Sequence, residues 1–235
     1  MITFSSTLLS DISWKDMKKH TLILFALALL LAGFTGCNSN SVKDIEGNSY
    51  RTVNIRTKVW MAENLKTTKF NDGTVIPLVP ENDSWTKLET PAVSWYNNDP
   101  DANRKLYGAL YNWYAINTGK VCPVGWHVAT EEEWSALYYL EGSGSVGGKL
   151  KEAGTAHWKS PNTDATNETG FAGLPGGYRS IQGVFNYIGI SGYWWSSTPF
   201  NDTNGLFYNL RFKSGELYKS RSEKFCGFSV RCVKN

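Results

Sequence analysis

The sequence predicts an α+β domain in which two helices in the first half of the chain are combined with a loop-rich, mainly antiparallel β-sheet. Short strand-like segments with alternating hydrophobicity lie toward both ends of the chain, and helical periodicity is confined to two stretches between residues 104 and 142. The 235 residues are 41% hydrophobic and 14% aromatic and include 22 glycines. This composition excludes a disordered, coiled-coil or collagen-like chain.

The charge of the chain excludes one class of partner. Lysine and arginine number 24 and aspartate and glutamate 21, so the formal net charge is +3. Proteins that bind the phosphate backbone carry a clustered basic surface. We therefore expect no nucleic acid partner.

Residues 1–37 have the pattern of a signal peptide for export. A basic stretch, residues 17–20, precedes an apolar run of thirteen residues, 22–34. This run is shorter than the roughly 20 apolar residues that a transmembrane helix needs, so a cleaved signal is favoured. Acidic residues would be unusual in the basic part of such a signal, and we therefore expect translation to start at Met17.

Cys37 resembles the lipidated cysteine of bacterial lipoproteins. Gly36 is the small residue of a lipobox, although Phe34 stands where leucine is usual. The alternative is an ordinary secretory signal followed by a chance cysteine. The resemblance implies an exported protein held at a membrane by acyl chains, and Asn38 is similar to the residue found in lipoproteins that pass to the outer membrane or cell surface. Residues 38–48 are expected to form a polar tether.

The first half of the domain is predicted to contain a β-hairpin, a long loop and one helix. Residues 50–55 and 58–61 alternate and are separated by two polar residues, which is typical of a hairpin. Residues 71–100 are dense in turn-forming residues and are expected to be mostly loop. Apolar side chains recur at helical spacing in residues 104–117, and Gly119 would end this amphipathic helix.

A second helix is predicted to begin at Thr130, where Glu133 can complete a capping box. Trp134, Leu137 and Tyr138 would form its buried stripe. Four short strand-like segments follow, and they suit an antiparallel sheet in which the terminal strands pair and bring the chain ends together. They lie at residues 192–195, 206–210, 216–218 and 228–232.

Six phrases occur in the order typical of one bacterial family. They are VWMAENL at residues 59–65, YNWY at 111–114, CPVGWHV at 122–128, LPGGYR at 174–179, GYWWSS at 192–197 and GFSVRCV at 227–233. Together they closely resemble the Fibrobacter succinogenes major paralogous domain family of exported proteins. We place this domain at residues 49–235.

The resemblance implies a fold related to C-type lectin-like domains and to the formylglycine-generating enzymes that modify sulfatases. Both combine two helices with a loop-heavy sheet. The implied protein is an extracytoplasmic module whose loops bind a glycan or a protein ligand. Fold analogy is weak evidence for function, and it supplies no specific ligand.

Export would place three further cysteines in an oxidising compartment. The resemblance to lectin-like domains implies a disulfide between Cys122 and Cys232, which would close a loop of about 110 residues and contribute roughly 4 to 5 kcal/mol on chain-entropy grounds. The alternative is a reactive or copper-binding pair of Cys226 and Cys232, like that of formylglycine-generating enzymes. It is disfavoured because the cysteines of those enzymes are more closely spaced. Cys226 is otherwise a free or partly buried thiol.

Residues 162–168 form a loop of oxygen-bearing side chains. Asp164, Asn167 and Glu168 are candidates for a Ca²⁺ site, which needs six to eight oxygen ligands. Only two of the three are charged, and the spacing of an EF-hand is absent. The favoured alternative is that these side chains bond to the backbone and stabilise the loop.

Nine of the ten tryptophans follow Cys37, and flat aromatic faces suit sugar rings. Trp85, Trp95, Trp158 and Tyr178 have loop-like surroundings and are candidates for a glycan-binding surface. The alternative for each is a role in the core. Of the paired residues 194 and 195, one is expected to point inward and the other outward.

The residues of the predicted domain do not indicate catalysis. His127 and His157 lack an evident nucleophile, and the glutamates at 131–133 suit the first turn of a helix. No lipase, phosphate-loop or zinc motif occurs. We therefore expect a non-enzymatic, lipid-anchored envelope module that binds a glycan or protein ligand. The alternatives are an oxidase that uses Cys226 and Cys232 and a purely structural envelope protein.

Overall fold

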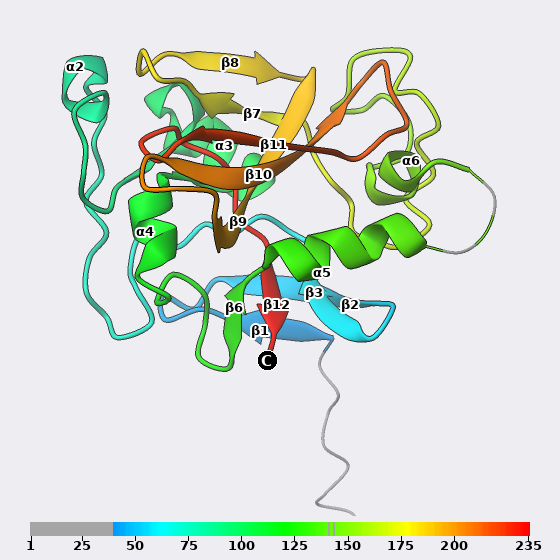
Figure 1. Ribbon diagram of the computed structural model, residues 1–235, viewed down its shortest axis with the longest axis horizontal. Coiled ribbons are helices and arrows are strands. Elements are labelled where there is room, and N and C mark those ends of the chain that lie inside the picture. Colours follow the sequence, from blue (N-terminus) through cyan, green and yellow to red (C-terminus); the bar gives the residue numbers. More distant parts are fainter. Residues whose placement is uncertain (1–39, 141, 143) are drawn as a thin grey trace, which may run out of the picture. The chain divides into compact units, whose positions relative to one another are not determined.

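Figure 1 shows the computed structural model, which describes residues 40–140, 142 and 144–235. The expected signal peptide and the expected lipidation of Cys37 lie outside the described residues. Within the described ranges, no helix is long and apolar enough to cross a membrane.

The first sheet combines segments from both ends of the described chain (Figure 1). Its strands, in spatial order, are β1 (Ser41–Lys43), β2 (Ser49–Ile55), β3 (Lys58–Met61), β12 (Cys232–Lys234) and β6 (Trp126–Val128). All neighbouring pairs are antiparallel, and β2 with β3 confirms the predicted hairpin. Because β12 lies between β3 and β6, the predicted pairing of the terminal strands is confirmed.

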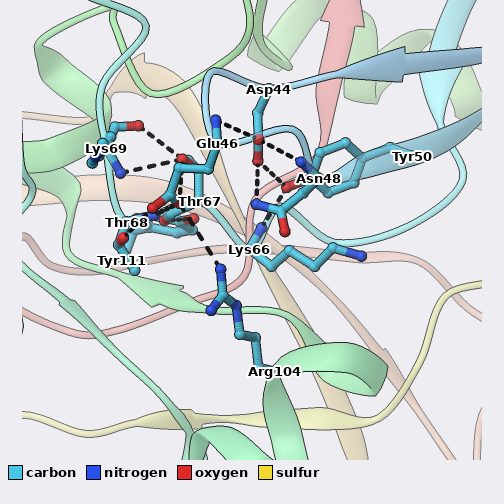
Figure 2. Close-up of polar contacts among 10 residues, drawn as sticks. All are labelled: Asp44, Glu46, Asn48, Tyr50, Lys66, Thr67, Thr68, Lys69, Arg104 and Tyr111. Carbon is cyan, nitrogen blue, oxygen red and sulfur yellow. Dashed lines mark hydrogen bonds and ion pairs between the residues drawn. The ribbon is translucent and has the colours of Figure 1, made fainter. Parts of the chain in front are cut away.

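Residues 41–48 are part of the folded domain, as Figure 2 shows for the loop after β1. Asp44 accepts a hydrogen bond from the Tyr50 hydroxyl at 2.6 Å. Glu46 accepts bonds from the amide and the hydroxyl of Thr68, at 2.6 and 2.7 Å. The expected tether is therefore wrong for residues 41–48, because strand pairing and two hydrogen-bonded carboxylates hold this segment on the domain.

The second sheet comes from the last third of the chain. Its strands, in spatial order, are β11 (Tyr218–Glu223), β10 (Asn204–Arg211), β9 (Ser191–Pro199), β7 (Gly176–Arg179) and β8 (Phe185–Ile188). β7 and β9 are parallel, and the other neighbours are antiparallel. A separate two-stranded sheet pairs β4 (Val93–Ser94) with β5 (Leu110–Tyr111). The described domain is thus mostly β, with two five-stranded sheets and short helices.

The predicted strands of this half are confirmed in part. Residues 192–195 and 206–210 lie within β9 and β10. The strand expected at 216–218 begins only at Tyr218. Residues 227–229 form single bridges and no regular strand, because Gly227, Phe228 and Ser229 contact β7, β5 and β9 in turn, and residues 230–231 belong to no strand.

The described helices are α2 (Asn82–Trp85), α3 (Pro100–Tyr107), α4 (Trp113–Asn117), α5 (Glu131–Ala136) and α6 (Val146–Leu150), with 3-10 turns at Tyr96–Asn98 and Leu137–Tyr139. The single helix expected at 104–117 is wrong: the chain breaks at Gly108, whose φ is +75°, and β5 separates α3 from α4. A Cβ at this glycine would lie 2.7 Å from the Leu65 carbonyl oxygen, so close packing requires glycine here.

The capping box predicted for the second helix is confirmed. The Thr130 hydroxyl accepts a bond from the Glu133 amide, and the Glu133 carboxylate accepts one from the Thr130 amide. Trp134 and Leu137 are buried as expected. Tyr138 is exposed because the helix tightens into a 3-10 turn at Leu137, so its expected place in the core is wrong.

Two aromatic clusters form the core. Trp134 lies in one of them, stacked on Tyr208 with ring centroids 4.9 Å apart, and Trp194 belongs to the same cluster. Trp195 belongs to the other cluster, where its ring centroid lies 4.3 Å from that of Phe228. Neither residue of this tryptophan pair points to solvent, as was expected of one, because β9 carries core on both of its faces.

The disulfide between Cys122 and Cys232 is present, which confirms the pairing that the family resemblance implies. The two sulfur atoms are 2.02 Å apart and the two Cα atoms 6.0 Å. The bond joins the loop before β6 to the first residue of β12. It thereby cross-links two neighbouring strands of the first sheet through the loop that leads into one of them. Among the cysteines that the structure describes, Cys226 is the free thiol, and it is buried.

Candidate functional site

Three of the four predicted platform residues lie in the interior. Trp85, Trp95 and Trp158 are 0%, 4% and 1% exposed. A cation covers each ring: the Arg179 guanidinium lies 4.3 Å from the Trp85 ring centroid, and the Lys151 ammonium lies 5.6 Å from that of Trp158. These tryptophans therefore stabilise loops and cannot present a flat face to a ligand. Only Tyr178 lies at a partly open surface.

The predicted calcium loop is organised around an ammonium group. Lys151 is fully buried, and its Nζ donates to the carbonyl oxygens of Thr163, Ser214 and Arg211 at 2.6, 2.9 and 3.3 Å. Burial lowers the pKa of Lys151 to about 8. The lysine ammonium group thus occupies carbonyl oxygens that could otherwise bind a cation.

The three candidate calcium ligands do not converge. Asp164 accepts a bond from Ser145, Asn167 accepts one from the Ala172 amide at 2.8 Å, and Glu168 lies 3.8 Å from the Lys149 ammonium. The part of the chain that the structure describes contains no group of three or more acidic, histidine or cysteine residues that could hold a metal ion. The loop-stabilising alternative accounts for these side chains.

A row of five side chains crosses the second sheet. In spatial order it consists of Tyr187 on β8, Tyr178 on β7, Tyr193 on β9, Asn209 on β10 and Tyr218 on β11, and we call it the five-strand row. Directly opposite residues share one face of a sheet, and Asn209 lies opposite both Tyr193 and Tyr218. Four strand spacings give the row a length of about 19 Å.

Backbone geometry brings Tyr187 into this row. Asn186 lies opposite Tyr178, so regular alternation would turn Tyr187 to the other face of the sheet. The φ of Tyr187 is +65°, and its ring instead stacks on that of Tyr178, with centroids 5.8 Å apart and planes 14° apart. A left-handed conformation costs a bulky residue about 1–2 kcal/mol. The strained residue leaves 50% of its surface exposed.

Tyr178 and Tyr193, the next two members of the row, are held in place by neighbouring rings. The Tyr178 and Tyr193 ring centroids are 4.8 Å apart, and Tyr193 stacks on buried Phe228 at 5.5 Å. Burial raises the pKa of both tyrosines. Their phenols therefore keep the proton at neutral pH and can donate hydrogen bonds from fixed positions.

Asn209 leaves a polar group unsatisfied in the middle of the row. It is 1% exposed, and its Nδ2 has no hydrogen-bond partner among the described residues. Beside it, the Tyr218 hydroxyl lies 2.9 Å from the Ser214 hydroxyl, and the Arg211 guanidinium lies 4.3 Å from the Tyr218 ring centroid. An unpaired buried donor costs about 1–3 kcal/mol, which an oxygen acceptor from a ligand would recover.

The other residues considered for chemistry have structural partners. His127 pairs with Glu133, and His157 pairs with Glu152 at 2.8 Å. Burial raises the pKa of Cys226 to about 12, and the Ser222 hydroxyl lies 3.2 Å from its sulfur. Since Cys232 is bonded to Cys122, it is not available for a reactive pair with Cys226.

The fold and the five-strand row together define a β-rich α+β domain with a partly exposed aromatic face. The model of the Fibrobacter succinogenes major domain matches residues 53–234, and the chain belongs to this family. No curated protein and no solved structure matches the chain significantly.

Sequence analysis found one member of the row, Tyr178, and missed the others. The alternation of Tyr193 with Trp194 and of Asn209 with Tyr208 placed these residues on strands, which was the available signal. It did not show which face is open. Tyr187 carries no such signal, because its position depends on a positive φ that a tyrosine rarely adopts.

Proposed function

We propose that this protein is a lipid-anchored module of the cell envelope that binds an extended glycan along the five-strand row. The carrying observation is the continuous series of contacting tyrosine rings, Tyr187, Tyr178 and Tyr193, that leads to the unsatisfied amide of Asn209. The proposal places the ligand on the sheet face and not, as expected from the sequence, on the loops. The comparison with C-type lectin-like domains enters it as an analogy of scaffold only.

The chemistry of the row supports a sugar chain over a purely apolar ligand. Aromatic rings contact the apolar faces of sugars, while phenol, amide and guanidinium groups can bond to sugar hydroxyls. The row combines these functions within about 19 Å, which suits several sugar units in line. Stacked and buried neighbours hold the rings in place before binding, which lowers the entropy cost of association.

The proposal assigns the protein no catalytic step. His127 and His157 pair with glutamates, and the Cys226 thiol is buried with a raised pKa. The proposed anchor is an acylated Cys37, which would hold the domain at the outer membrane or cell surface. Measuring the intact mass of the native protein tests the anchor: acyl chains on Cys37 support it, and an unmodified or differently cleaved N-terminus contradicts it.

Binding of cellohexaose and chitohexaose, measured by isothermal titration calorimetry after a glycan-array screen, tests the site. The Tyr187→Ala variant should weaken binding of the preferred glycan about tenfold. Tyr139→Ala is the matched control, because Tyr139 is also exposed but lies in the 3-10 turn after α5. If no glycan binds, or if both variants bind equally, the site is wrong and a purely structural role is favoured.

Asn209→Leu separates binding from folding. Leucine has a similar shape and removes the unsatisfied Nδ2, so the variant should be as stable as the wild type or more stable. Glycan binding should nevertheless fall about tenfold, because one donor is lost. A variant that binds normally would remove Asn209 from the site.

A further inference from the structure

A pocket separate from the five-strand row lies between the β2–β3 turn and the start of α5. Its volume is about 330 Å³, at the lower end of the range for small-molecule sites. Ile55, Trp60 and Leu137 line it with apolar surface, and all three are buried in the aromatic cluster that contains Trp134. The apolar lining therefore belongs to a rigid part of the core.

Charged groups of both signs line the same pocket. Arg56 comes from the β2–β3 turn, Lys58 from the start of β3, and Glu132 from the first turn of α5. The φ of Arg56 is +54°, and its Nη1 donates to the Tyr139 carbonyl oxygen. The guanidinium keeps four further N–H donors.

Glu133 already has three partners at the pocket. Its carboxylate lies 2.9 Å from His127 Nε2 and 3.2 Å from Lys58 Nζ, and it accepts the Thr130 amide of the capping box at 3.0 Å. Lys58 uses one of its three N–H donors in this pair. The exposed carboxylate of Glu132 has no hydrogen bond or ion pair among the described residues.

We propose that this pocket binds a small zwitterion with an apolar side chain, such as a free hydrophobic amino acid. Lys58 and Arg56 would bind its carboxylate, Glu132 its ammonium group, and the side chain would lie against Trp60 and Leu137. An amino acid satisfies both signs of charge at once, whereas a simple acid or amine leaves one of them unpaired. This site is independent of the glycan proposal, because its residues come from the first sheet and α5.

Titration calorimetry of the full chain in mild detergent tests the proposal with three probes. L-Phenylalanine carries both charges, phenethylamine lacks the carboxylate, and 3-phenylpropionate lacks the ammonium group. L-Phenylalanine should bind about tenfold more tightly than either analogue. Equal binding of all three probes, or no heat with any of them at millimolar concentration, would overturn the proposal.

Charge variants assign the two ends of the ligand. Lys58→Gln should abolish the preference for L-phenylalanine over phenethylamine, and Glu132→Gln should abolish its preference over 3-phenylpropionate. Lys43→Gln is the matched control, because Lys43 is exposed on β1 outside the pocket. Preferences that persist in Lys58→Gln and Glu132→Gln would overturn the assignment.

A blocked pocket supplies a test that does not depend on charge. Ala136→Phe adds a ring at the lining of the pocket and should abolish binding of L-phenylalanine. The melting temperature of the same variant should stay close to that of the wild type, which shows that it is folded. A folded variant that still binds L-phenylalanine would contradict the location of the site.

Discussion

Removal of the disulfide between Cys122 and Cys232 should destabilise the domain by about 5 kcal/mol. The two cysteines are 110 residues apart in sequence. A cross-link that closes a loop of this length removes about 16 cal/mol/K of chain entropy from the unfolded state, which is about 5 kcal/mol at 25 °C. This is a large fraction of the roughly 5–15 kcal/mol that stabilises a typical domain.

Guanidinium unfolding of the full chain measures this loss in the Cys122→Ala/Cys232→Ala variant. Cys226→Ala is the matched control, because it removes one buried sulfur atom without opening a cross-link. For a domain of this size the melting temperature should fall by about 10–20 °C. If the double variant loses no more than twice the loss of Cys226→Ala, the effect comes from the missing sulfur atoms alone and the cross-link argument is refuted.

The remaining predictions concern pH, strain and the calcium loop. Burial by itself raises the pKa of Glu133, but the hydrogen bonds that the carboxylate accepts, first of all from His127, lower it to about 2. The same bond raises the pKa of His127. Their pair should therefore stabilise the domain most between about pH 4.5 and 6.5, and less as the pH falls toward 2 or rises through the folded pKa of His127. Unfolding curves across this range should lose the alkaline decline in His127→Gln, and an unchanged decline would contradict the assignment. Tyr187→Asn should keep wild-type stability, because asparagine tolerates positive φ, yet lose glycan binding; a melting temperature several degrees lower would show that the tyrosine is needed for folding. Lys151→Met should cost about 2–4 kcal/mol in denaturant unfolding, because it leaves the carbonyl oxygens of Thr163 and Ser214 without the donor that Lys151 supplies, and a neutral effect would argue against the ammonium-centred loop. Calcium or EDTA should leave the wild-type melting temperature unchanged, and a calcium-dependent rise that Asp164→Asn removes would restore the metal site.

Local features of the fold could be predicted from the sequence, and features that depend on distant contacts could not. The hairpin of β2 and β3 and the capping box of Thr130 and Glu133 were predicted because both depend on neighbouring residues. The break at Gly108 was missed, since its cause is the approach of the Leu65 carbonyl from another part of the chain. Helical spacing alone continued the helix across it.

The same distinction explains the candidate site. Trp95 and Trp158 lie in irregular segments and Trp85 ends the short helix α2, and only tertiary structure shows that all three rings are buried. A strand pattern indicates two faces for Tyr178 and its neighbours but does not indicate which face remains open. The disulfide was predicted because the family resemblance supplied a pairing that the spacing of the cysteines does not contain.

The middle of the five-strand row is rigid because the residues that follow Tyr178 and Tyr193 are core residues. Tyr178 precedes Arg179, whose guanidinium is buried on the other side of β7 and donates to the carbonyl oxygens of Val79 and Pro80 at 2.6 and 2.7 Å. Tyr193 precedes fully buried Trp194 in the same way. Each of these two strands is therefore fixed by its buried side chain. The strand in turn fixes the position of the outward side chain next to it. A binding surface of this kind can change its outward residues, and so its ligand, while the inward residues and the fold stay the same.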